Sequence, residues 1–121
     1  MKILVVEDEQ QAAGSLARTL CRAAPGSEYL CAPTAADALR LARRGPLDAA
    51  FLDLEMPGMG GLAVARTLQK LQPRCNLIVA TAHPEYALEA LQMFVSGFLL
   101  KPTSEADVRA VLANLRYPPA E

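Results

Sequence analysis

The 121-residue sequence has little of what marks a disulfide-linked, membrane-spanning or metal-cluster protein. Its three cysteines are odd in number and lack the spacing of a zinc site, which favours reduced thiols, and a single histidine excludes a histidine-rich metal site. No apolar stretch approaches the roughly 20 residues of a membrane span. With 12 basic and 13 acidic residues, the chain lacks the positive excess of nucleic-acid-binding domains, so we expect this segment to contact neither nucleic acid nor membrane.

The length suits a single domain with a proper core, because 52% of the residues are hydrophobic. An apolar run begins within two residues of the N-terminus and leaves no room for a signal peptide, so a cytoplasmic location is expected. Residues 1–116 are expected to form the domain. Residues 117–121, which include two prolines, are expected to begin a linker or C-terminal tail.

Strand and helix signals alternate along the chain. Short apolar runs predict strands buried on both faces at about 2–6, 28–32, 49–53, 76–81 and 97–101. Helical periodicity and end signals predict helices at about 10–23, 34–43, 62–71, 84–94 and from 104 onward. This (βα)5 order indicates an α/β fold with a doubly wound parallel sheet, for which the flavodoxin-like strand order 2-1-3-4-5 is one arrangement.

Several short signals mark the ends of these elements. Thr34 and Asp37 resemble a capping box with Asp in place of Glu, and Pro84 suits the first turn of a helix. The loop over residues 55–61 contains three glycines and a proline, which indicates unusual backbone angles.

Polar side chains follow four of the predicted strands where each strand ends: Glu7 and Asp8, then Asp53, Thr81 and Lys101. Ligands bind outside the carboxyl ends of the strands in such sheets, so these groups are expected to converge on one pocket. Each residue alone has an ordinary explanation as a cap, a turn or a β-former. Their coincidence at four strand ends favours a functional site.

The chemistry of this set points to phosphoryl transfer. Three neighbouring carboxylates (Glu7, Asp8 and Asp53) need a cation, and oxygen ligands on a compact site favour Mg²⁺. The ammonium of Lys101 and the hydroxyl of Thr81 suit the spread charge of a transferring phosphoryl group. Asp53 is the natural nucleophile at the centre.

At this point the chain resembles the receiver domain of two-component response regulators, over about residues 2–116. The matching motifs occur in order and at suitable spacing: Val5-Val6-Glu7-Asp8-Glu9, Asp53-Leu54-Glu55-Met56-Pro57-Gly58-Met59-Gly60-Gly61, Ala80-Thr81-Ala82 and Lys101-Pro102. The resemblance implies a phosphoacceptor signalling switch that works with Mg²⁺.

The resemblance implies that Asp53 accepts a phosphoryl group from a sensor histidine kinase. Glu7 and Asp8 would hold the metal, Asp8 more directly, together with Asp53 and the backbone carbonyl of Glu55. Such a domain is not a conventional enzyme, although it catalyses its own phosphotransfer and its slow dephosphorylation.

The resemblance also assigns roles at the last two strand ends. Lys101 would pair with the carboxylate and then with the phosphoryl oxygens, and Thr81 would donate to the phosphoryl group and report its presence. The Lys101–Pro102 bond would be cis, which proline permits.

The stretch from Thr81 to Ala90 looks like receivers that precede a LytTR-type DNA-binding domain. This implies transcription regulation and an output domain beyond residue 121. Phe98 departs from the commonest pattern, because many receivers carry Tyr there, and it is either a packing switch or a core residue. His83 either contacts the phosphate or stands at the start of the fourth helix, and we favour the helix end.

The signal would pass to the surface of the fourth helix, the fifth strand and the fifth helix, because Thr81 can follow new phosphoryl oxygens only by moving its loop. An apolar set on the fourth helix is a candidate homodimer contact: Leu88, Leu91 and Met93. Core packing explains any two of the three equally well.

Two other functions remain open from the sequence. One is a protein-binding pseudo-receiver that works without phosphorylation, although such domains usually lack one of the acidic groups or the lysine. The other is an aspartate-nucleophile phosphatase, which needs a second Asp where this chain has Glu55. A flavin site is disfavoured, because acids occupy the first loop in place of a phosphate-binding turn.

Overall fold

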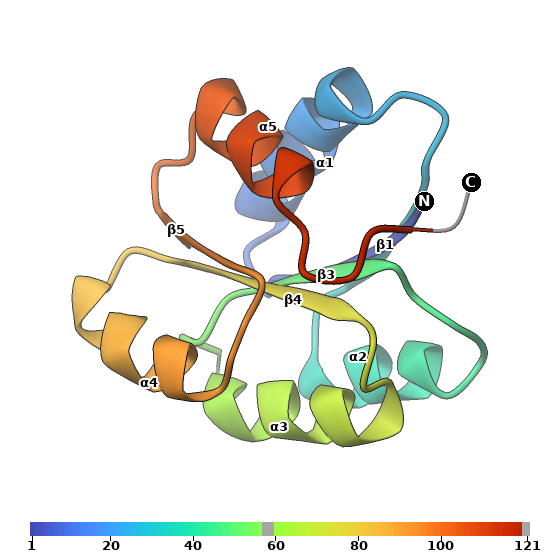
Figure 1. Ribbon diagram of the computed structural model, residues 1–121, viewed down its shortest axis with the longest axis vertical. Helices are drawn as coiled ribbons and strands as arrows, with labels where there is room; N and C mark the ends of the chain where they lie inside the picture. The colour runs from blue at the N-terminus through green and yellow to red at the C-terminus, as the bar shows by residue number, and fades with distance from the viewer. Residues whose placement is uncertain (57–59, 120–121) are drawn as a thin grey trace.

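The computed structural model describes residues 1–56 and 60–119 (Figure 1). Within this part of the chain, five parallel strands form one sheet in the order β2-β1-β3-β4-β5, as predicted. The strands are β1 (Lys2–Val6), β2 (Glu28–Ala32), β3 (Ala49–Leu52), β4 (Asn76–Thr81) and β5 (Gly97–Leu100). The prediction for the glycine-rich loop falls partly on residues 57–59, which lie outside the described residues.

Helices cover both faces of the sheet, with α1 and α5 on one face and α2, α3 and α4 on the other (Figure 1). Their bounds are α1 (Gln10–Ala23), α2 (Ala35–Ala42), α3 (Gly61–Leu71), α4 (Ala87–Gln92) and α5 (Glu105–Ala113). None of the helices in residues 1–56 and 60–119 combines the length and apolarity that a membrane crossing requires. The doubly wound α/β fold predicted from the sequence is therefore confirmed.

The register of the sheet brings the expected site residues to one edge. Val6 at the end of β1 pairs with Ala32 of β2 and with Leu52 of β3. The amide of Asp53 then donates to the carbonyl of Val6 at 3.1 Å. Because parallel strands end together, the residues that follow β1 and β3 emerge side by side.

The central strands are buried on both faces, which explains their continuous apolar sequences. Phe51 and Ile78 pack with Leu20 of α1 and Val108 of α5, whereas Leu52 packs on the opposite face with a cluster that includes Val64 of α3. Every residue of β3 and β4 is buried. This double core holds the strand ends in fixed positions beneath the site.

The helix-start signals behave as expected, with one addition. The Thr34 hydroxyl accepts the amide of Asp37 at 3.1 Å, and the Ser104 hydroxyl accepts the amide of Asp107 at 3.1 Å. The Glu9 carboxylate caps α1 by accepting the amides of Gln11 and Ala12, a role that the sequence analysis did not predict. Asp8, next to this cap, is left at the exposed surface.

The fourth helical segment differs from its predicted form. It opens with a 3₁₀ turn over Pro84–Tyr86, which carries Pro84 in its first turn, and α4 ends at Gln92 rather than at residue 94. Met93 is half-buried against the core, whereas Phe94 has a φ of 58° and is 71% exposed. Met93 therefore has the core-packing role that the sequence analysis left open, whereas Leu88, Leu91 and Phe94 are exposed.

Gly61 begins α3 where the chain crosses close to the backbone of Leu54. A Cβ at residue 61 would overlap the Leu54 main chain, including its carbonyl oxygen at 2.5 Å. Backbone atoms cannot rotate away as a flexible side chain can. The start of α3 therefore requires glycine at this position because of close approach.

We expect Gly61→Ala to destabilise the domain by about 1–3 kcal/mol, the usual cost of overpacking. Gly60→Ala is the matched control, because its Cβ meets nothing within 4 Å and its φ of −59° suits alanine. Urea unfolding of both variants measures the difference. Equal stability of the two variants would show that the backbone at Leu54 moves away at little cost.

Candidate functional site

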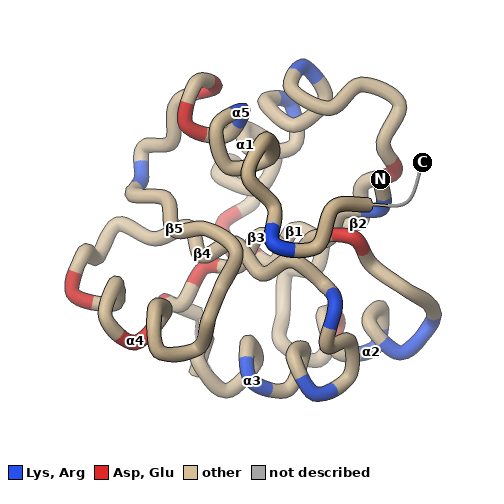
Figure 2. Tube along the Cα trace, in the orientation of Figure 1, with Lys and Arg blue, Asp and Glu red and all other residues tan. Residues whose placement is uncertain are grey.

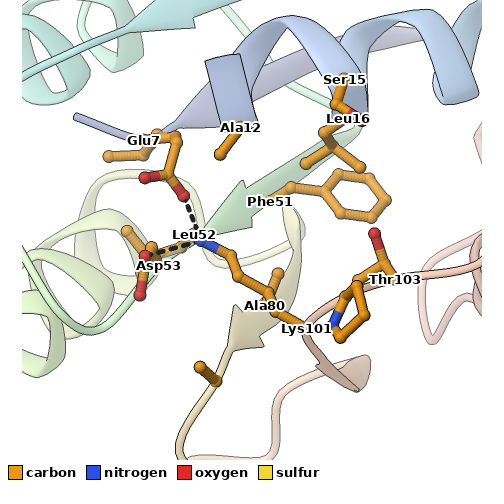
Figure 3. A pocket seen from close by; sticks show the side chains of 13 residues that line it. Glu7, Ala12, Ser15, Leu16, Phe51, Leu52, Asp53, Ala80, Lys101 and Thr103 are labelled. Carbon is orange, nitrogen blue, oxygen red and sulfur yellow. Dashed lines mark hydrogen bonds and ion pairs between the residues drawn. The ribbon is translucent and has the colours of Figure 1, made fainter. Parts of the chain in front are cut away.

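Lys101 joins two carboxylates from different strands at the carboxyl edge of the sheet. Its Nζ lies 2.8 Å from Asp53 Oδ2 and 2.5 Å from Glu7 Oε2 (Figure 3). Glu7 follows β1, Asp53 follows β3 and Lys101 follows β5, so three strand ends converge on one ammonium group. The convergence predicted for these three residues is confirmed.

The two carboxylates are largely withdrawn from water, since Glu7 is 7% and Asp53 is 8% exposed. Burial raises the pKa of Glu7, and the hydrogen bond from Lys101 only partly opposes this shift. Burial lowers the pKa of Lys101, but hydrogen bonds to Asp53 and Glu7 outweigh it and leave the pKa raised. Lys101 therefore stays charged at neutral pH.

The acidic groups at this edge of the sheet suit a magnesium ion that takes only one or two ligands from protein side chains. Asp53 Oδ1 accepts the amide of Glu55 at 2.9 Å, and Glu7 Oε1 accepts the amide of Glu9 at 3.1 Å. Among residues 1–56 and 60–119, no three His, Cys, Asp or Glu side chains form a group that could hold a metal. The predicted cluster of Glu7, Asp8 and Asp53 is thus looser than expected, because buried Glu7 turns toward the charge of Lys101.

Magnesium usually takes one or two carboxylates and keeps several waters. Asp8 and Asp53 follow the neighbouring strands β1 and β3 and carry carboxylate oxygens, the hard donors that match this preference. The donor set therefore fits a partly hydrated Mg²⁺ rather than an ion enclosed by protein.

Thr81 ends β4 and is fully buried. Its carbonyl accepts the amide of Lys101 at 2.8 Å, so the ends of β4 and β5 are directly joined. Its hydroxyl accepts the amide of His83 at 3.2 Å and keeps its own proton for donation to another group. The Lys101–Pro102 peptide bond is cis, as the resemblance implied.

A polar cluster stands between the loop after Asp53 and the start of the fourth helical segment. The Tyr86 hydroxyl donates to Glu55 Oε1 at 2.7 Å, and His83 Nε2 lies 3.8 Å from the same oxygen. His83 Nδ1 lies 3.1 Å from Glu85 Oε1. His83 immediately precedes the 3₁₀ turn, at the helix start that the sequence analysis favoured for it. Its side chain makes no capping hydrogen bond there and lies beside the Glu55 and Glu85 carboxylates instead.

Beneath the three-residue ion cluster lies a cavity of about 440 Å³. Its walls come from small or apolar side chains of α1 and the sheet, including Ala12, Leu16 and Phe51 (Figure 3). Lys101 and Thr103 border it from the chain that follows β5. Glu7, Asp53 and Lys101 therefore border a hollow whose other walls are largely apolar.

Charge is unevenly distributed around the site (Figure 2). Residues 75–100, which include α4, contain Glu85 and Glu89 but no Lys or Arg. Residues 60–75, which include α3, contain Arg66, Lys70 and Arg74 but no acid. Although the net charge of the chain is close to zero, the segment that includes α4 is acidic and the segment that includes α3 is basic.

Phe98 of β5 is half-buried and packs against the core cluster that contains Ala90 of α4. This placement favours a core role for Phe98 in the form of the protein described here. Its neighbours on β5 differ, since Leu99 is buried and Leu100 is 47% exposed.

Two curated relatives are similar to nearly the whole chain. The chain is 37% identical to the positive alginate biosynthesis regulatory protein of Pseudomonas aeruginosa, with 99% of this chain and 53% of that protein covered. It is 30% identical to the sensory transduction protein LytT of Bacillus subtilis, with 96% and 48% covered. The chain therefore spans about half the length of these relatives.

Among solved structures, the response regulator protein TrrA of Thermotoga maritima in complex with Mg(2+)-BeF superposes with a TM-score of 0.82. The identity is 28%, and the match covers 93% of this chain and 96% of that one. The family model described as the response regulator receiver domain matches residues 3–113, which include β2 to β5, all of β1 but its first residue, and the three ion-cluster residues. The chain therefore belongs to the response regulator receiver domain family.

Proposed function

We propose that this domain is a phosphoacceptor switch in which Asp53 receives a phosphoryl group from a sensor histidine kinase in the cytoplasm. The observation that carries the proposal is the buried Asp53 carboxylate held 2.8 Å from the Lys101 ammonium. The Mg(2+)-BeF complex of the Thermotoga maritima protein supports a metal-assisted phosphoryl site in a related fold.

In this proposal, an oxygen of Asp53 attacks the phosphorus of a phosphohistidine. A P–O bond forms while the P–N bond breaks, and the imidazole leaves with the electron pair and takes up a proton. Water later attacks the acyl phosphate, which returns the aspartate and releases inorganic phosphate. Because Lys101 already neutralises part of the local charge, the approach of an anionic donor costs less.

Lys101 and Thr81 have separate tasks in the proposal. Lys101 moves its hydrogen bond from Asp53 to a phosphoryl oxygen, and Glu7 holds the lysine in place through the other carboxylate contact. The Thr81 hydroxyl turns toward the new phosphoryl oxygens and donates its proton to one of them. Because the same hydroxyl accepts a hydrogen bond from the His83 amide, its movement pulls on the main chain at His83. That movement reaches the fourth helical segment one residue later.

Asp8, Asp53 and the carbonyl of Glu55 would hold Mg²⁺, with Glu7 in a supporting position through Lys101. When bound, the ion supplies positive charge for the phosphoryl oxygens. The Tyr86 hydroxyl bond to Glu55 gives the loop that carries this carbonyl a fixed side-chain anchor.

The output in this proposal is transcription. One relative is named as a regulatory protein and the other as the sensory transduction protein LytT, and both are about twice as long as this chain, which supports a further domain of the LytTR DNA-binding type. Activation would also pair two copies through α4, β5 and α5. The exposed apolar side chains on this face support such pairing: Leu88, Leu91, Phe94 and Leu100.

Asp53→Asn is expected to abolish acid-labile phosphate incorporation from a small phosphodonor with Mg²⁺, because the amide is not a nucleophile of comparable strength. Electrophoresis that retards phosphorylated protein measures the incorporation. Asp48→Asn is the matched control, since Asp48 lies at the opposite end of β3 and caps the N-terminal strand through the Lys2 amide. Labelling that survives in Asp53→Asn would instead favour the phosphorylation-independent pseudo-receiver.

Lys101→Ala is expected to raise the Mg²⁺ affinity about tenfold, because the removed ammonium repels the ion at a few ångströms. The same change is expected to slow phosphorylation at least about tenfold, since the phosphoryl oxygens lose a donor. Calorimetric titration with Mg²⁺ and timed labelling measure the two effects.

Lys70→Ala on α3 is the matched control for charge removal, and it should change neither quantity. A Lys101→Ala protein with unchanged Mg²⁺ affinity would contradict a shared site for the metal and the lysine.

Leu91→Arg is expected to prevent self-association in the presence of Mg²⁺ and beryllofluoride, because it places a charge in the centre of the exposed apolar set. Sedimentation velocity measures the dimer fraction. Ala63→Arg on the exposed side of α3 is the control. Dimerisation that is equal in both variants would exclude the α4 face as the contact.

A further inference from the structure

Asn76 is a fully buried polar residue at the first position of β4, at the sheet edge opposite the ion cluster. Its side-chain Nδ2 donates to the carbonyl of Asp48 at 2.8 Å and to the carbonyl of Tyr117 at 2.7 Å. Its Oδ1 accepts from the Ser96 hydroxyl at 2.7 Å and from the Tyr117 amide at 2.9 Å. The amide therefore makes all four hydrogen bonds that it can make.

These bonds join two segments that are distant in the sequence. Tyr117 begins the C-terminal tail, which returns from α5 to the sheet in Figure 1, and Ser96 immediately precedes β5. Both the amide and the carbonyl of the Tyr117 main chain bond to the Asn76 side chain. One side-chain oxygen thus serves both the tail and the turn between α4 and β5.

Side chains of the tail make two more contacts in the same region. The Arg74 guanidinium lies 5.0 Å from the Tyr117 ring centre, and the Arg116 guanidinium lies 5.9 Å from the ring centre of Phe94. We call Asn76, Ser96, Arg74 and Phe94 together the tail-docking site. Two of its four members, Phe94 and Ser96, belong to the turn that follows α4.

The turn has room to move against the tail. A cavity of about 240 Å³ lies between the end of α3, the end of α4 and Tyr117, with Gln69, Phe94 and Ser96 in its walls. Close-packed neighbours would resist a shift, whereas a void permits one. The Gln69 side chain donates to the Met93 carbonyl across this gap at 2.7 Å, so the end of α4 rests on polar contacts.

We propose that the tail-docking site binds residues 116–119 in the resting domain and loosens when the turn between α4 and β5 moves. The inference rests on the proposed function, because phosphorylation of Asp53 supplies the movement through Thr81 and α4. Withdrawal of the Ser96 hydroxyl removes one of the two donors to Asn76 Oδ1. The Asn76 side chain then keeps its bonds to Asp48 and Tyr117 but loses the bond that ties it to the turn, so Tyr117 leaves the site more readily.

The Tyr117 amide is a direct reporter, because Pro118 and Pro119 have no amide hydrogen. We expect hydrogen exchange at Tyr117, measured by NMR, to be slow in the resting protein and at least about tenfold faster with Mg²⁺ and beryllofluoride. Asn76→Ala is expected to give fast exchange in both states. Ser96→Ala, at a half-buried position, is expected to speed exchange in the resting state and to reduce the response.

Thr67→Ala is the control, because the Thr67 hydroxyl donates to the Ala63 carbonyl within α3, so its loss should leave Tyr117 exchange unchanged. If Asn76→Ala does not fold, Ser96→Ala alone decides the outcome. Equal Tyr117 exchange in both states, in protein whose spectrum shows bound beryllofluoride, would overturn the tail-docking proposal and leave the proposed function intact. Failure of beryllofluoride to bind would overturn both.

Discussion

The arrangement of the site depends on one ammonium group shared by two buried carboxylates. Glu7, Asp53 and Lys101 each follow the end of a different strand. A single unpaired charge would be strongly destabilised by desolvation in such a largely buried position. The parallel sheet brings the strand ends together, and the ion pairs then fix the side chains. Because Lys101 balances only one of two negative charges, the cluster remains ready for a further cation and for a phosphoryl group.

This interaction connects the chemistry to the rest of the domain through short steps. Lys101 bonds through its amide to Thr81, the Thr81 hydroxyl accepts the amide of His83, and the fourth helical segment begins at the next residue. At the far end of α4, Ser96 shares Asn76 with the tail. These contacts and the intervening main chain connect Asp53 to Tyr117 at the start of the tail.

The sequence predicted the features that follow from periodicity and strand order. Continuous apolar runs predicted the positions of the strands. The polar residues directly after these runs predicted that Glu7, Asp53 and Lys101 lie close together. It could not predict that the Glu7 carboxylate bonds to Lys101, since that contact depends on how the side chains are buried after folding. Nor could it predict that α4 ends at Gln92, so that Met93 packs against the core while Phe94, whose φ is positive, is exposed. The sequence analysis did not predict the four hydrogen bonds of Asn76. A single amide side chain at the start of an otherwise apolar buried strand indicates that such bonds are needed.

The most direct test of the central claim is to locate the acyl phosphate. The protein is treated with a small phosphodonor and Mg²⁺, reduced with borohydride so that a phosphorylated aspartate becomes homoserine, and sequenced by mass spectrometry. The account predicts homoserine at position 53 and nowhere else. Homoserine at position 8, or none at all in protein that is folded and binds Mg²⁺, would contradict it.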